Sequence, residues 1–224
     1  MQTPDSGKLQ APAAFLIDLD GTLVDTLGDF HAVLGLTLGE LGLPPVSRAF
    51  IELTVGQGSE HLIRAVLAEV GGEPGLYERA WGLYQQHYSA LNGRHAKVYP
   101  GVIEGLERLR ALGRPMACLT NKPGDFARGL LASKQLDRYF DRVCGGDEFA
   151  RKKPDPLPLV ATCAMLGVAP QRAWMIGDSS NDARAAAAAG CGCVLVTYGY
   201  NHGEPIGAVP ALQHVDSLAA IAFG

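Results

Sequence analysis

The sequence predicts an α/β protein with a doubly wound, parallel, Rossmann-like sheet and an inserted helical cap. Two observations support this fold class. Short apolar runs typical of buried strands alternate with segments of helical periodicity. In addition, roughly 70 residues with helical signals of their own separate the first two core strands, far more than a strand crossover needs.

Four apolar runs and one weaker candidate are predicted to form the parallel strands of the core. Each is short and continuous, as expected of a strand that is buried on both faces. The weakest of the five is 142–144. The predicted strands are 13–17, 115–119, 142–144, 173–176 and 193–196.

Helical periodicity predicts two groups of helices. One group alternates with the core strands, and Gly113 and Gly167 are placed to end two of its members. The core helices are predicted at 102–112, 126–136, 156–166 and 182–189, and those of the insert at 30–41, 59–70 and 76–91. We therefore predict a catalytic core of residues 13–25 and 98–224, and a cap of residues 26–97.

Size and charge exclude several function classes. The 224 residues suffice for a core domain with a small insert, and the net charge of −4 provides no basic surface for nucleic acid or an anionic membrane. No apolar run is long enough to cross a bilayer, and residues 1–12 have the polar composition expected of a flexible extension. The five cysteines lack the spacing of a disulfide framework, which predicts reduced thiols and a cytoplasmic location.

Polar residues follow four of the predicted strands. These residues are Asp18, Thr120, Asp178 and Thr197. Ligands of open parallel sheets bind at the carboxyl ends of the strands. The sequence therefore places the functional site at this edge.

The segment Asp18-Leu-Asp20-Gly21-Thr22 carries the most informative chemistry. Carboxylates two residues apart on an extended chain point the same way, and two bare carboxylates at one site repel each other. A divalent cation removes that conflict, and Mg²⁺ favours oxygen ligands. A turn rich in Asp and Gly is the alternative interpretation, but the preceding buried strand favours a site.

Three later motifs are ambiguous when taken singly. Thr120-Asn121 either binds a phosphate oxygen or forms a turn. Lys152-Lys153-Pro154 is either a pair of surface lysines or a source of charge for the site. The acids of Gly177-Asp178-Ser-Ser-Asn-Asp182 either support a metal site or cap a helix, and both interpretations can hold together.

Taken in order, these motifs make the chain resemble the haloacid dehalogenase superfamily of phosphohydrolases, over about residues 15–200. Within that superfamily the chain is most similar to the phosphoglycolate phosphatases. Five further segments carry this second likeness: Val55-Gly-Gln-Gly58, Leu119-Thr-Asn-Lys-Pro123, Gly145-Gly-Asp147, Lys152-Lys-Pro154 and Leu195-Val-Thr-Tyr-Gly-Tyr200.

The resemblance implies a two-step mechanism. Asp18 would attack phosphorus and form an aspartyl phosphate, and Asp20 would act as general acid and then as general base. Mg²⁺ would bind the Asp18 carboxylate, the Asp20 backbone carbonyl and Asp178. The phosphoryl group would contact Thr120, Asn121 and Lys153, and Asp182 would position Lys153 or a metal-bound water. Lys153 is preferred to Lys152 because the lysine of this family directly precedes the proline.

The cap is expected to select the substrate, which would be a small phosphorylated metabolite. A cation or exposed amides of the cap must meet the carboxylate of phosphoglycolate. The candidates are Gly56 and Gln57 of the Gly56-Gln57-Gly58 turn, and the basic residues Arg48, His61 and Arg64. For each basic residue, a place on the solvated face of an amphipathic helix is the competing interpretation. A monomer or a homodimer is expected.

Alternative functions remain open at this level. The same motifs suit a phosphatase for a sugar phosphate, a nucleotide or pyrophosphate, and a sugar phosphomutase. A dehalogenase needs no acid at Asp20, and a receiver-like signalling domain needs no large helical insert, so both are disfavoured by the sequence.

Overall fold

The computed structural model describes residues 11–223, so residues 1–10 of the predicted N-terminal extension lie outside the described part. The core is a six-stranded sheet in the order β5-β4-β1-β6-β7-β8, and every neighbouring pair of strands is parallel. The strands are β1 (Ala14–Ile17), β4 (Met116–Leu119), β5 (Arg142–Cys144), β6 (Ala173–Gly177), β7 (Gly192–Val196) and β8 (Gln213–Val215). The predicted fold class is confirmed.

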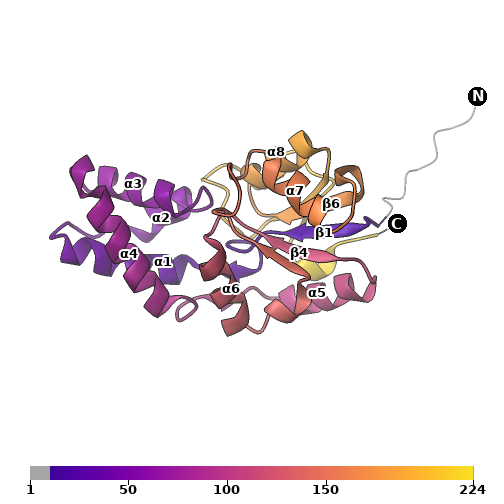
Figure 1. The fold of residues 1–224 in the computed structure, drawn as a ribbon, viewed down its shortest axis with the longest axis horizontal. Coiled ribbons are helices and arrows are strands. Elements are labelled where there is room, and N and C mark those ends of the chain that lie inside the picture. The colour runs from indigo at the N-terminus through magenta and orange to yellow at the C-terminus, as the bar shows by residue number, and fades with distance from the viewer. Residues whose placement is uncertain (1–10, 224) are drawn as a thin grey trace, which may run out of the picture.

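Helices cover both faces of this sheet (Figure 1). The four core helices are α5 (Val102–Ala111), α6 (Gly124–Ser133), α7 (Leu157–Met165) and α8 (Ser180–Ala189). Successive side chains of β1 lie on opposite faces of the sheet. Phe15 and Ile17 pack with α5 and α6, whereas Ala14 and Leu16 pack with α7 and α8. β1 is therefore buried on both sides at the centre of the sheet, which fixes the position of the residue that follows it.

The insert between β1 and β4 folds as a separate helical layer at one end of the sheet (Figure 1). Its helices are α1 (Leu27–Glu40), α2 (Arg48–Thr54), α3 (Ser59–Glu69) and α4 (Tyr77–Leu91). They share an apolar core whose largest fully buried side chains include Tyr84 and Tyr88. Two short strands, β2 (Val24–Asp25) and β3 (Lys97–Val98), pair antiparallel where the chain enters and leaves this layer.

The sequence did not predict helix α2 or strand β8, nor the two-residue strands β2 and β3. α2 has only seven residues, too few for periodicity to identify it, although the Ser47 side chain caps it by accepting from the Phe50 N–H at 3.1 Å. β8 has three residues and lies at the edge of the sheet, where His214 is exposed. Within residues 11–223, no helix has both the length and the apolar character that crossing a membrane requires.

Candidate active site

Three of the four strand-end residues converge on one site. Asp18 follows β1, and Thr120 and Asp178 follow its two neighbours, β4 and β6. All three are buried. Thr197 follows β7 but is exposed, and its N–H donates to the carbonyl of Val215, so it does not join them.

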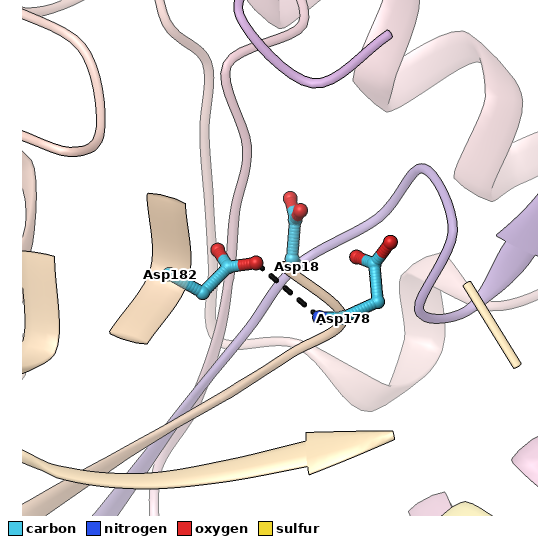
Figure 2. Close-up of side chains that lie close together, drawn as sticks. All are labelled: Asp18, Asp178 and Asp182. Atoms are coloured by element: carbon cyan, nitrogen blue, oxygen red, sulfur yellow. Dashed lines mark hydrogen bonds between the residues drawn. The ribbon is translucent and has the colours of Figure 1, made fainter. Parts of the chain in front are cut away.

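The carboxylates of Asp18, Asp178 and Asp182 form a buried cluster, with one oxygen of each within 4.8 Å of the others. Figure 2 shows Asp18 between the other two acids. Asp178 is fixed on both of its oxygens: the Thr22 hydroxyl donates to Oδ1 at 2.8 Å and the Tyr200 N–H donates to Oδ2 at 2.6 Å.

Asp182 is already committed to hydrogen bonds within the protein. Its Oδ1 accepts from Lys153 Nζ at 2.7 Å. Its Oδ2 accepts from the Ser179 hydroxyl at 2.8 Å and from the Asp178 N–H at 3.3 Å, the bond drawn in Figure 2. Asp182 thus caps α8, as one interpretation of this motif predicts, and it also holds Lys153.

The two adjacent lysines have different surroundings. Lys153 is buried, and its Nζ lies 3.0 Å from Asp18 Oδ1 and donates to the Leu119 carbonyl at 2.9 Å. Burial alone would lower the pKa of Lys153, but Asp18 and Asp182 raise it above its usual value, so the ammonium is charged. Lys152 instead pairs with Glu60 of α3 near the surface.

The acid cluster fits a divalent cation. Burial raises the pKa of Asp18 to about 7, against the opposing effect of Lys153, and Asp182 raises it further. Burial, Asp182 and Asp18 likewise raise the pKa of Asp178. Asp18 Oδ1 is buried and, despite the nearby Lys153, accepts no aligned hydrogen bond. Asp18 and Asp178 therefore supply oxygen ligands for a cation. The residues around these two carboxylates do not fully neutralise their negative charge.

Thr120 and Asn121 lie in the loop that follows β4. The Thr120 hydroxyl accepts from the Lys122 N–H at 3.2 Å. The Asn121 side chain donates to the Gly56 and Lys153 carbonyls, both at 2.8 Å, and accepts from the Lys153 N–H at 2.9 Å. Asn121 therefore connects the turn of the helical insert to the lysine loop.

A small pocket lies between the strand ends and the helical insert. The sheet side contributes Asp18, Asp20, Thr120, Asn121 and Lys122, and the insert contributes Phe30, Val55, Gly56, Gly58, Ser59 and Leu62. The turn has φ of +110° at Gly56 and +94° at Gly58, values that favour glycine. Gln57 between them is exposed and does not line the pocket.

The basic candidates of the insert lie elsewhere. Arg64 stacks on Tyr77, with 3.7 Å between the guanidinium carbon and the ring centroid. Arg48 lies 3.8 Å from Asp25, and its side chain is 57% exposed. His61 is exposed, and none of these three residues lines the pocket.

The structure adds Lys122, a residue that the sequence did not single out. Its Nζ lies 3.0 and 3.1 Å from the two carboxylate oxygens of Asp20. The rings of Phe30 and Tyr88 flank the same ammonium, with centroids at 4.7 and 4.8 Å. Lys122 belongs to the segment Leu119-Thr-Asn-Lys-Pro123, but Lys-Pro-Gly equally suits a solvated turn, so the sequence does not assign it a role.

Comparison with known proteins gives consistent matches along the chain. The family model described as haloacid dehalogenase-like hydrolase matches residues 15–196. A phosphoglycolate phosphatase of Thiobacillus denitrificans is 41% identical, with 94% of each chain covered. One of Pseudomonas putida is also 41% identical, with 95% of this chain and 79% of the relative covered.

Two solved structures share this fold over most of their length. A predicted phosphoglycolate phosphatase from Haemophilus somnus has a TM-score of 0.89 at 30% identity, covering 95% of this chain and 97% of the other. CbbY from Rhodobacter sphaeroides, solved in complex with phosphate, has a TM-score of 0.80 at 25% identity, covering 93% and 96%.

Proposed function

This chain belongs to the haloacid dehalogenase-like hydrolase family, and we propose that it is a Mg²⁺-dependent phosphomonoester hydrolase that acts through a phosphorylated Asp18. The observation that carries the proposal is the placement of Asp18 at the end of the central strand. There its carboxylate lies beside Lys153 and Asp178 and opens to the pocket.

The proposed roles follow from these contacts. Asp18 attacks phosphorus, and Thr120, Asn121 and Lys153 bind the phosphoryl oxygens. Asp20, which also lines the pocket, donates a proton to the leaving oxygen and then takes one from the attacking water. Asp182 holds Lys153 in position by the 2.7 Å hydrogen bond. Most of the rate acceleration then comes from alignment and charge neutralisation.

Mg²⁺ is the proposed cofactor because the donor set is made of hard oxygens. The carboxylates of Asp18 and Asp178 and the backbone carbonyl of Asp20 would hold it, while Asp182 would position Lys153 through their 2.7 Å hydrogen bond. When bound, Mg²⁺ offsets the negative charge of the carboxylates and of the phosphate.

The pH dependence of stability provides a test of this cofactor. The pKa of Asp18 rises from 3.8 to about 7 on folding, chiefly through burial. Protonated Asp18 therefore contributes to the free energy of unfolding. This contribution is complete below about pH 4 and is lost as the pH rises through about 7. Mg²⁺ binds the ionised form, so thermal unfolding should show a larger Mg²⁺-induced rise in Tm at pH 8 than at pH 5. At about 100 times Kd the rise at pH 8 should be about 5–10 °C. Equal rises at both pH values would contradict the proposal.

The packing around Asp178 provides a second test. A Cβ at Gly199 would lie 2.3 Å from Asp178 Cβ, 2.4 Å from its Oδ2 and 2.4 Å from the Gly21 carbonyl oxygen, whereas a Cβ at Gly207 meets nothing within 4 Å. Gly199→Ala should therefore displace Asp178 and weaken Mg²⁺ binding by about 10- to 100-fold in a calorimetric titration. Gly207→Ala is the matched control. Equal Mg²⁺ affinity in the two folded variants would rule out Asp178 as a ligand.

The substrate that we propose is 2-phosphoglycolate. Support comes from the relatives named phosphoglycolate phosphatase, which are about 40% identical over most of their length. The small size of the pocket also supports this substrate. The test is release of phosphate with Mg²⁺ from 2-phosphoglycolate, sugar phosphates, nucleotides and pyrophosphate. The value of kcat/KM should be highest for 2-phosphoglycolate. A kcat/KM value more than about tenfold higher for another compound would contradict the proposal that 2-phosphoglycolate is the substrate.

A sugar phosphate is the second candidate. A form of CbbY from Rhodobacter sphaeroides that carries an Asp-to-Asn substitution was solved with xylulose-1,5-bisphosphate, and it shares this fold with a TM-score of 0.80 at 25% identity. If hexose phosphates are isomerised without release of phosphate, a mutase replaces the hydrolase. Product analysis of the sugar phosphates, added to the phosphate-release panel, therefore separates the three activities.

A further inference from the structure

Lys122 is a buried cation whose role the proposed mechanism leaves open. It lies in the loop between β4 and α6, its exposed fraction is 5%, and it lines the pocket. Transfer of an ammonium group from water to such a place is unfavourable unless the group is paired. The structure provides one carboxylate partner within residues 11–223, Asp20, at 3.0 and 3.1 Å.

The surroundings of Lys122 hold the ammonium while leaving it able to bind another anion. An ammonium has three N–H donors, and among the described residues only the oxygens of Asp20 accept from it. The ring faces of Phe30 from α1 and Tyr88 from α4 add a cation–π attraction that uses no hydrogen bond. A second acceptor can therefore bind without displacing either ring.

Lys122 is also the one cation that lines the pocket within the described chain. Lys153 does not line the pocket, its side chain contacts Asp18, Asp182 and the Leu119 carbonyl, and its proposed ligand is the phosphoryl group. Two basic residues of the insert were candidates for binding the substrate carboxylate, but Arg48 lies against Asp25 and Arg64 lies against Tyr77. A second negative group on a substrate bound in this pocket has Lys122 as its nearest source of charge.

We infer that Lys122 is the specificity-determining residue that binds the carboxylate of the substrate. This inference rests on the proposed function and deepens it. Thr120, Asn121 and Lys122 are consecutive, so the proposed phosphate contacts and the carboxylate contact come from one loop. In 2-phosphoglycolate a single carbon separates the phosphate from the carboxylate. The protein groups that bind them must therefore lie close together, as neighbouring residues of one loop do. Phe30 and Leu62 line the same pocket and limit the length of the substrate.

The test compares two substrates that differ only in the group that Lys122 would bind. 2-Phosphoglycolate has a carboxylate where 2-hydroxyethyl phosphate has a neutral CH₂OH group. Because Lys122 also contacts Asp20, a substitution at Lys122 is expected to change turnover of both compounds. The informative quantity is therefore the ratio of their kcat/KM values, from which a general effect on Asp20 cancels.

In Lys122→Met this ratio should fall by about 10- to 150-fold, the value of a hydrogen bond between charged groups. Lys122→Arg keeps the positive charge and should retain most of the preference. Lys152→Met is the matched control, because it removes a neighbouring lysine that does not line the pocket, and its ratio should equal that of the wild type. Lys122→Gln, which keeps an N–H donor for Asp20, replaces the Met variant if that variant does not fold.

The outcomes separate this inference from the proposed function. If the wild type prefers 2-phosphoglycolate and the ratio is unchanged in the folded Lys122 variants, the carboxylate is bound elsewhere and the inference is wrong. If the wild type shows no preference for the carboxylated compound, the proposed substrate is wrong and the inference falls with it. A loss of preference confined to Lys122→Met and Lys122→Gln supports both.

Discussion

Asp18→Asn is expected to lower phosphate release by at least about 1,000-fold while leaving the protein folded. The amide is a poor nucleophile and carries no charge for a metal ion. Because the ionised carboxylate is disfavoured by burial, as the raised pKa of Asp18 shows, the metal-free variant should have a Tm at least equal to that of the wild type at pH 8. Steady-state assays and thermal unfolding in EDTA measure the two effects.

The matched control for this variant is Asp137→Asn. Asp137 is exposed, so the same chemical change there should leave both activity and Tm near the wild-type values. An Asp18→Asn protein that retains wild-type activity would disprove the role of Asp18 as nucleophile. An activity loss that is accompanied by a large fall in Tm would instead indicate that the site is held together by Asp18.

Lys153→Met is the second variant with a large expected effect, on stability as well as on activity. Its ammonium is the buried partner of both Asp18 and Asp182. Its removal leaves carboxylates buried without a partner, which costs about 3–5 kcal/mol of stability. For a chain of this length, that corresponds to a fall in Tm of about 6–20 °C. Phosphate release should also be lost.

Lys152→Met provides the comparison one residue away. Lys152 pairs with Glu60, whose side chain is 50% exposed, so its loss should cost no more than about 1 kcal/mol. Thermal unfolding of the two variants side by side tests the assignment of Lys153 as the lysine of the site. Equal destabilisation of both proteins, or greater destabilisation in Lys152→Met, would reverse that assignment.

The main features of the fold could be predicted because the core strands are continuous apolar runs. The runs at Ala14–Ile17 and Ala173–Gly177 are buried along their whole length, so they leave a clear sequence pattern. α2 and β8 could not be predicted in the same way. Each is short, and its stability depends on tertiary contacts that the local sequence does not encode.

The site was predictable in part for a similar reason. Polar residues at the ends of adjacent parallel strands must meet, and Asp18, Thr120 and Asp178 do so. Which groups a side chain contacts depends on the tertiary structure, which the local sequence does not encode. Thr197 follows a strand yet is exposed and does not join the cluster, and Lys122 lies in a turn-like sequence yet is buried against Asp20.

Identification of the residue that carries the covalent phosphate tests the role of Asp18 most directly. Excess enzyme is mixed with ³²P-labelled 2-phosphoglycolate and Mg²⁺, quenched in acid during a single turnover, reduced with borohydride and mapped by mass spectrometry. Borohydride reduces an aspartyl phosphate to homoserine, so homoserine is expected at position 18. Homoserine at another aspartate, or inversion of configuration at phosphorus in a chiral substrate, would contradict this role of Asp18, since two displacements at phosphorus retain the configuration.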